Sequence, residues 1–160
     1  STSRRQRQMC IRDSGYTYQC DVRVSGFIAL YNKSNTWNNI YPVYKNTGET
    51  FAQTDEGVEL LENDTWTRSK RFSIVNEAFS TSEKQRVKGH DFDIIMYINS
   101  TTGTVDEVNF EFYKSTPYTT IPISTFRKIE TEIKKNIWYT PTAEGKELSY
   151  IYYWWAQEPK

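Results

Sequence analysis

The stretch that most constrains the fold covers residues 92–155, because its apolar residues change period in a fixed order. Residues 92–99 form an apolar run, and residues 105–112 alternate apolar and polar side chains after a turn at Gly103. A helical pattern follows over about residues 122–136, and two further extended segments lie within residues 138–155. A period of two is typical of strands, and a period near 3.6 is typical of helices. The order therefore predicts strand, strand, helix, strand and strand.

The first two of these strands are predicted to pair as an antiparallel hairpin, since a connection this short cannot join parallel neighbours. Residues 92–99 carry apolar side chains on both faces, which is typical of a central strand covered on both sides. In the second strand one face is predicted to be buried and the other to meet solvent. The buried face holds Val108, Phe110 and Phe112, and the solvent face holds Glu107, Asn109 and Glu111.

The helix is predicted from Pro122 to Asn136. Proline is favoured in a first helical turn because its missing N–H would have no partner there. An apolar stripe at spacings of three, four and four then marks one buried face. Its members are Phe126, Ile129, Ile133 and Ile137.

The first half of the chain predicts more strands and a short helix. Residues 15–32 alternate in strand fashion with an interruption at Gly26, and residues 40–44 and 49–54 can form a further hairpin. Residues 71–78 fit either a strand or a helix. A short helix capped by Ser82 is expected before Gly89, which also marks the best position for a boundary within the domain.

Residues 1–14 resemble translated read-through of a sequencing adapter, so we interpret them as a non-native leader and exclude them from the fold prediction. A natural basic arm is the alternative. Residues 15–160 are then predicted to be one α+β domain. Under this interpretation Cys10 and Cys20 are not a disulfide pair, and Cys20 alone is expected to act as a small buried apolar residue.

The composition excludes several classes of partner. Twenty basic and twenty acidic residues give zero net charge, so nothing predicts binding to nucleic acid, which needs a basic surface against its phosphates. No apolar run approaches the ~18 residues that a membrane span requires. The many tyrosines and tryptophans fit strands and also fit half-exposed binding faces.

The segment of about residues 91–155 resembles the C-terminal domain of TonB-type proteins. The resemblance rests on the strand at residues 94–99, residues 102–108, the helix near Phe126, residues 138–142 with Pro141, and residues 145–148 with Gly145. It implies an antiparallel sheet backed by one helix, in a periplasmic or secreted protein that works by binding. The whole chain also resembles small exported proteins of gut anaerobes.

No arrangement of residues predicts catalysis or a cofactor. His90 is the one histidine, and no Gly-x-Ser-x-Gly motif surrounds any serine. A metal site at His90, Asp91 and Asp93 lacks a second cluster to complete the coordination shell. Carboxylates such as Glu107 and Glu111 are best explained as solvated residues of one strand face, although an enzyme with dispersed carboxylates is an alternative.

We therefore predict an α+β fold and a non-catalytic binding module. Its proposed mode is the pairing of an extended partner with an exposed edge strand, for which residues 148–155 are the candidate. The predicted partner-binding side chains are Tyr150, Tyr152, Tyr153, Trp154 and Trp155. Alternation places Trp154 and Trp155 on opposite faces, so at least one is expected in the core. A carbohydrate-binding module that uses surface aromatics, among them Trp37 and Trp66, is the alternative.

Overall fold

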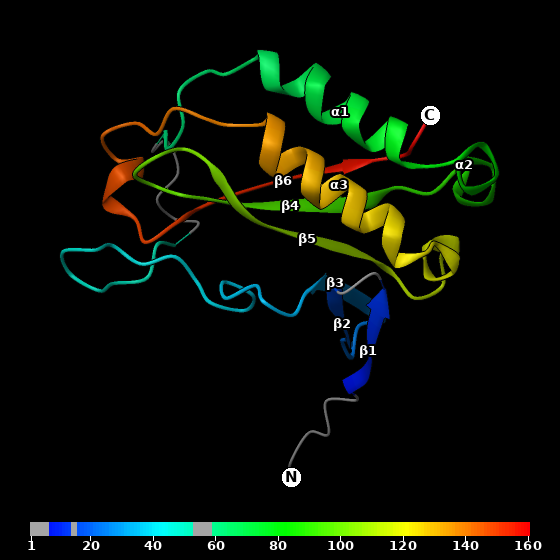
Figure 1. The fold of residues 1–160 in the computed structure, drawn as a ribbon. Helices are drawn as coiled ribbons and strands as arrows, with labels where there is room; N and C mark the ends of the chain where they lie inside the picture. The colour runs from blue at the N-terminus through cyan, green and yellow to red at the C-terminus, as the bar shows by residue number, and fades with distance from the viewer. Residues whose placement is uncertain (1–6, 14–15, 53–58) are drawn as a thin grey trace, which may run out of the picture.

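One antiparallel sheet organises the part of the chain that this computed structural model describes, which is residues 7–13, 16–52 and 59–160. Its strands lie in the order β1-β2-β3-β5-β4-β6 (Figure 1). Their bounds are Arg7–Asp13 for β1, Tyr16–Val22 for β2, Phe27–Asn32 for β3, Phe92–Ile98 for β4, Val105–Tyr113 for β5 and Ile151–Gln157 for β6. Because β3 pairs with β5, the segments before and after Gly89 share this sheet.

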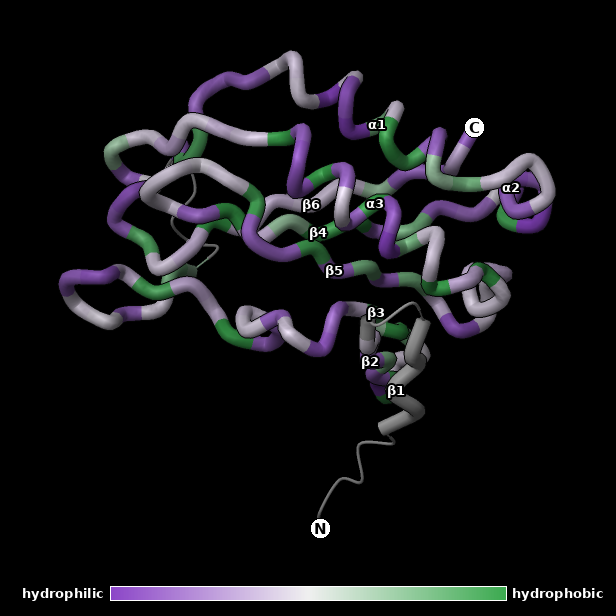
Figure 2. The backbone as a smooth tube through the Cα atoms, in the orientation of Figure 1, coloured by the Kyte–Doolittle hydropathy of each residue, from purple (hydrophilic) through white to green (hydrophobic). Residues whose placement is uncertain are grey.

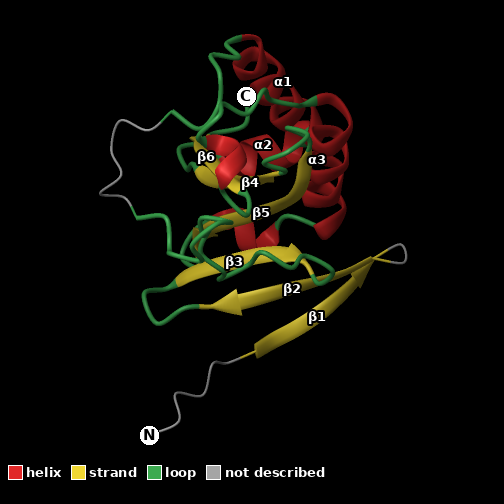
Figure 3. Ribbon diagram, turned by 90° about the vertical axis from the view of Figure 1, so that its left-hand side faces the viewer, coloured by secondary structure: helices red, strands yellow, loops and turns green. Residues whose placement is uncertain are grey.

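Helices cover one face of the sheet. These are α1 (Trp66–Ala78), α2 (Thr81–Val87) and α3 (Ile123–Asn136), with short 3-10 turns at Pro117–Thr120 and Gly145–Glu147. Figure 3 shows α1 and α3 side by side on the same side of the strands. The main helix was thus predicted almost to the residue, and Pro122 stands at its N-cap position. The undecided segment 71–78 is helical and belongs to α1.

The main core lies between α3, α1 and the sheet. Figure 2 colours much of β4 at the hydrophobic end of the scale, while α3 alternates between hydrophobic and hydrophilic residues. The predicted stripe of α3 is buried, and so is the predicted apolar face of β4. The largest fully buried side chains in this core include Tyr18, Phe92, Phe110, Phe126 and Ile129. The expectation that β4 is covered on both faces is confirmed, because Ile95 and Tyr97 on its other face are also buried.

Two predictions about individual elements were wrong, and a third was correct only in part. The segment from Trp138 to Pro141 forms two isolated bridges, Trp138 to Thr104 and Pro141 to Leu61, rather than a strand, so the order of the second half is strand, strand, helix and strand. The proposed hairpin of residues 40–44 and 49–54 is present only in part. Val43 forms an antiparallel bridge to Thr50, and the N–H groups of Tyr44 and Phe51 donate to the carbonyls of Glu49 and Pro42 at 2.8 and 2.9 Å, but neither segment is a strand, and residues 53–54 lie outside the described residues. A lone bridge satisfies only a pair of backbone groups, which is insufficient to define a strand.

The N-cap of α2 is Ser80 rather than Ser82. Its hydroxyl accepts the N–H of Glu83 at 3.2 Å, and the Glu83 carboxylate accepts the N–H of Ser80 at 2.6 Å. This reciprocal pair is a capping box. Two features favour Ser80 as the N-cap. Its carboxylate partner, Glu83, stands three residues later, and its own backbone is extended.

Candidate functional site

Strand β6 is the last strand of the sheet on the side opposite β1. Within the described part of the chain it pairs only with β4, from Phe92 against Gln157 to Ile98 against Ile151. An edge strand of this kind leaves alternate N–H and C=O groups without a ladder partner. The predicted edge is therefore found, although the strand begins at Ile151 and not at Leu148.

The five side chains predicted to bind a partner divide between the core and the surface. Tyr150 and Trp155 are buried, whereas Tyr152, Tyr153 and Trp154 are exposed by 44%, 37% and 54%. The expected separation of the two tryptophans is confirmed, since Trp155 packs in the main core on the helix side. Two surfaces result: Tyr152 and Trp154 share the face away from the helices, and Tyr153 lies on the helix face near Tyr139.

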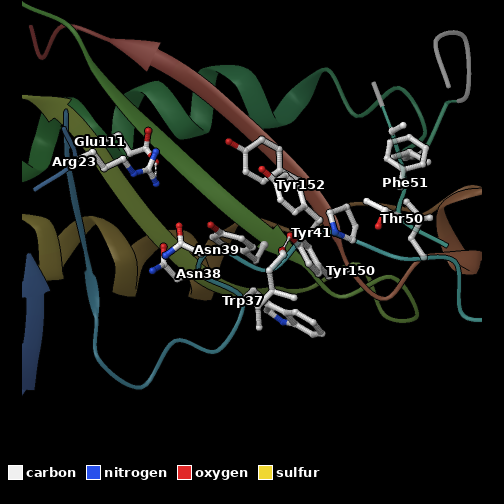
Figure 4. A pocket seen from close by; sticks show the side chains of 16 residues that line it. Arg23, Trp37, Asn38, Asn39, Tyr41, Thr50, Phe51, Glu111, Tyr150 and Tyr152 are labelled. Carbon is white, nitrogen blue, oxygen red and sulfur yellow. Dashed lines mark hydrogen bonds and ion pairs between the residues drawn. The ribbon is translucent and has the colours of Figure 1, made fainter. Parts of the chain in front are cut away.

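A groove lies on the face of the sheet opposite the helices. It has a volume of about 950 Å³. Figure 4 shows ring-bearing side chains in its middle, with Arg23 and Glu111 toward one end and Thr50 and Phe51 toward the other. Its lining residues are Arg23, Trp37, Asn38, Asn39, Ile40, Tyr41, Pro42, Thr50, Phe51, Ala52, Leu60, Tyr97, Glu111, Leu148, Tyr150 and Tyr152.

One wall of the groove, residues 37–42, is held to β5 by Glu107. Its carboxylate accepts the backbone N–H groups of Thr36 and Trp37, the latter at 3.0 Å, and the Thr36 hydroxyl at 2.9 Å. Glu107 was predicted to be solvated, which was wrong, because this segment covers it and leaves it 7% exposed. The period-two pattern identifies its face correctly but carries no information about a loop that returns over that face.

A second buried polar group, Asn109, connects the wall to the sheet. Asn109 accepts a hydrogen bond from Asn35 at 2.8 Å and donates to Asn38 and to the Tyr97 hydroxyl, both at 3.2 Å. Since each contact satisfies a polar atom that is shielded from water, the network fixes the wall in one position. Asn109 was also predicted to meet solvent and is instead 2% exposed.

Aromatic contacts complete the floor of the groove. The rings of Trp37 and Tyr150 lie 4.6 Å apart, and those of Tyr97 and Tyr150 lie 5.4 Å apart. The Tyr150 hydroxyl donates to the Ile40 carbonyl. Burial raises the pKa of Tyr150 to about 12, with the neighbouring charges of Tyr152 and Glu107 acting in the same direction. The phenols of the floor are therefore neutral hydrogen-bonding groups at ordinary pH.

The charged end of the groove contains one ion pair. Arg23 Nη2 lies 3.1 Å from Glu111 Oε1. Asp93 stands directly opposite Glu111 across β4 and β5. Burial raises the pKa of Asp93, and the charges of Glu111 and Asp91 raise it further. Arg23 thus pairs with the carboxylate of Glu111, while burial disfavours the ionised form of Asp93.

The structure does not gather the residues that were considered for metal binding or catalysis. Among the described residues, no three His, Cys, Asp or Glu side chains form a group suited to a metal ion. His90 is exposed, and its backbone carbonyl accepts the Tyr118 hydroxyl at 2.6 Å. Cys20, the one cysteine with a described side chain, is free and half-buried.

Sequence reasoning did not identify most of the groove. Trp37 was named as a surface aromatic of the carbohydrate-binding alternative, but Asn38, Asn39 and Tyr41 were not singled out. A signal was present, because asparagine tolerates positive φ better than most residues and this stretch is rich in it. Asn39 adopts a φ of 63°, which turns the chain along the wall of the groove.

Together these features define an α+β protein with an antiparallel sheet, helices on one face and an aromatic groove on the other. The chain belongs to the family described as "Domain of unknown function (DUF5043)", which matches residues 5–155. The matched range includes much of the segment predicted to be a non-native leader. Within that segment, residues 7–13 pair with β2 as β1, and residues 1–6 and 14 lie outside the described part.

A crystal structure shows the same fold. It is that of a DUF5043 family protein from Bacteroides uniformis ATCC 8492, which is 36% identical to this chain. The similarity covers 94% of this chain and 90% of that one, with a TM-score of 0.88. No curated protein matches the chain. Neither match is to a TonB-type protein, so the TonB-like description of residues 91–155 gains no support from them.

A membrane-spanning helix was not expected from the sequence. In the described ranges, no helix is both long enough and apolar enough to cross a bilayer.

Proposed function

We propose that this protein is a non-catalytic binding module that adds an extended peptide of a partner protein to the edge of its sheet at β6. The observation that carries the proposal is the position of β6, which ends the sheet and presents exposed aromatic side chains. In such binding the main chain supplies hydrogen bonds, and alternate side chains supply specificity.

Both faces of β6 support this mode because each presents an exposed aromatic ring. Trp154 is exposed by 54% on the face away from the helices, and Tyr153 is exposed by 37% on the helix face. A paired peptide strand would place successive side chains against these two rings in turn. Neither ring is needed to fill the main core, since Trp155 occupies that position.

Strand β6 itself also has few of the features that protect edge strands. Residues 151–156 carry no charged side chain and no proline, although charges and prolines are the usual means by which edge strands avoid partners. Charge begins only beyond the strand, at Glu158 and Lys160. An apolar, uncharged edge therefore favours pairing with another chain.

The exported location is part of the same proposal. It derives from the resemblance to envelope and secreted proteins and fits a module that works by binding. Detecting the native protein in the secreted or periplasmic fraction of its source cells would support it, and finding it only in the cytoplasm would contradict it.

The binding mode is tested by selection from a phage-displayed library of random peptides on the immobilised protein. Selected peptides are expected to be rich in β-branched and aromatic residues, and to slow hydrogen exchange of the β6 amides. Trp154→Lys places a charge on the edge and is expected to weaken their binding at least about tenfold, or ~1.4 kcal/mol.

Trp138→Lys is the matched control, because Trp138 is exposed by 55% but lies outside β6. It is expected to leave peptide binding unchanged. The proposal is wrong if the selected peptides protect amides elsewhere, or if both variants bind them as the wild type does.

A further inference from the structure

We infer that the groove on the face opposite the helices is a binding site for a neutral oligosaccharide. This inference rests on other groups than peptide pairing at β6 does. The groove shares Tyr152 and the face away from the helices with β6, but its other lining residues lie outside that strand, and a ligand there would not use the unpaired backbone groups of β6. Sugars have apolar C–H faces and hydroxyl groups that both donate and accept hydrogen bonds. A site for them needs flat rings and short polar side chains within one cavity.

The rings are present in the middle of the groove. Trp37, Tyr41 and Tyr152 line it together (Figure 4). Tyr41 is exposed by 77% and Tyr152 by 44%, so part of each ring remains accessible to a ligand. Binding to such exposed rings is most favourable for a ligand that covers their apolar faces while it leaves the phenol hydroxyl hydrogen-bonded.

Polar groups are interleaved with the rings. Asn38, Asn39 and Thr50 line the groove, and their amide and hydroxyl groups both donate and accept hydrogen bonds, as sugar hydroxyls do. A pocket with apolar faces and a few placed polar groups is the usual form of a small-molecule site. A peptide would need a row of backbone partners, which side-chain amides do not provide in regular order.

Charge and shape restrict the ligand further. Among the described lining residues the charged side chains are Arg23 and Glu111, and these two are paired with each other at 3.1 Å. An anionic or cationic ligand would have to compete with that ion pair, whereas a neutral ligand would not. The volume of about 950 Å³ extends from this pair to Thr50 and Phe51, which suits a short chain of sugar units better than a single unit.

The wall of the groove is held in place before any ligand arrives. Glu107 and Asn109 fix residues 35–38, as described above, and the Tyr150 hydroxyl holds the Ile40 carbonyl. Binding then requires little ordering of the chain, which preserves affinity for a ligand whose individual contacts are weak.

Isothermal titration calorimetry with maltohexaose, cellohexaose, xylohexaose and mannohexaose tests the inference. At least one of them is expected to bind, and Tyr41→Ala is expected to weaken that binding at least about tenfold. Because Tyr41 is largely exposed, this variant should keep the wild-type melting temperature. Trp138→Ala is the matched control, since Trp138 is exposed but neither lines the groove nor belongs to β6.

The inference is overturned if none of the four oligosaccharides binds, or if Tyr41→Ala binds the same oligosaccharide as tightly as the wild type. Tighter binding of oligogalacturonate, a charged probe of similar length, would also overturn it. Loss of oligosaccharide binding in Trp154→Ala with full binding in Tyr41→Ala would move the site from the groove to the edge. The peptide selection on β6 is unaffected by any of these results.

Discussion

The carboxylate of Glu107 accepts the backbone N–H of Trp37 at 3.0 Å, across 70 residues of sequence. The same carboxylate accepts both the N–H and the hydroxyl of Thr36. One buried anion on β5 therefore satisfies three donors of a segment that has no regular secondary structure. Glu107 therefore makes more hydrogen bonds to the groove wall than Asn109 or Tyr150 does.

Replacing Glu107 is expected to release the wall. Glu107→Ala removes all three acceptor contacts and should lower the free energy of unfolding by about 2–3 kcal/mol, as expected for hydrogen bonds to a charged group. Glu107→Gln keeps one acceptor oxygen and should cost about 1 kcal/mol. Urea denaturation measures both values, and amide hydrogen exchange at Thr36 and Trp37 should become faster in each variant.

Glu144→Gln provides the control for the loss of a carboxylate, because Glu144 is exposed. It should change stability by less than about 0.5 kcal/mol. Unchanged hydrogen exchange at Thr36 and Trp37 in Glu107→Ala would show that other contacts hold the wall.

Gly103 is expected to be the least replaceable glycine of the described chain. It has a φ of +78°, and an added Cβ would lie 1.7 Å from the Tyr139 carbonyl oxygen. The contact involves backbone on both sides, since Tyr139 N–H also donates to the Gly103 carbonyl at 2.9 Å. Gly103→Ala should cost more than about 3 kcal/mol, because steric overlap adds to the penalty for positive φ.

Gly48→Ala separates these two contributions. Gly48 has a similar φ of +75°, but nothing lies within 4 Å of its added Cβ. It should cost only about 1–2 kcal/mol, the conformational penalty alone. Equal losses of stability in the two alanine variants, measured by chemical denaturation, would refute the role assigned to the Tyr139 carbonyl.

Much of the fold was predictable because local patterns dominate it. The stripe from Phe126 to Ile137 and the apolar run of β4 each bury the faces that their periods predict. Helix α1 was harder, because its buried face includes Thr67 and Arg71, two polar residues that weaken the apolar period. The segment from Trp138 to Pro141 has the residues of a strand, but in the structure it forms only isolated bridges, to Thr104 and Leu61, which are tertiary contacts that no local pattern encodes.

The candidate site was less predictable, and the reason is physical. The position of β6 at the edge follows from strand order, which the sequence suggested only through the place of the last strand in the chain. The groove is built from segments such as residues 37–42 and 50–52, which have no periodicity and are positioned by distant side chains such as Glu107 and Asn109. Contacts over such sequence separations leave no mark in local patterns.

Asp93 should make stability depend on pH. Burial raises its pKa, with Glu111 and Asp91 adding to the effect, so the folded chain binds this proton more tightly than the unfolded chain does. The resulting contribution is fully present below the unfolded-state pKa of about 3.9 and is lost as the pH rises through the pKa of the folded state. Asp93→Asn removes this titration.

Relative to the wild type, Asp93→Asn should therefore be more stable at neutral pH than at acidic pH. Thermal melting of both proteins across that range measures the difference. Glu62→Gln, at an exposed carboxylate, corrects for the general loss of one charge. A difference between Asp93→Asn and the wild type that stays constant with pH would contradict the assignment.

Arg71 is held by aromatic rings rather than by carboxylates. It is 3% exposed, and its guanidinium carbon lies 4.5 Å from the Trp155 ring centroid and 5.0 Å from that of Tyr153. Its Nε and Nη1 atoms have no hydrogen-bond partner among the described residues. The favourable cation–π contacts, worth about 2 kcal/mol when shielded from water, are thus opposed by the cost of burying a charge with unsatisfied donors.

Two substitutions distinguish these contributions. Arg71→Met keeps most of the packing volume between α1 and β6 and removes the buried charge, so stability should change by less than about 1 kcal/mol. Arg71→Ala removes the packing as well and should cost about 2–4 kcal/mol, by analogy with other truncations of large buried side chains. If Arg71→Met proves as destabilising as Arg71→Ala in chemical denaturation, the cation–π contacts outweigh the desolvation cost, and the guanidinium itself joins α1 to the edge strand.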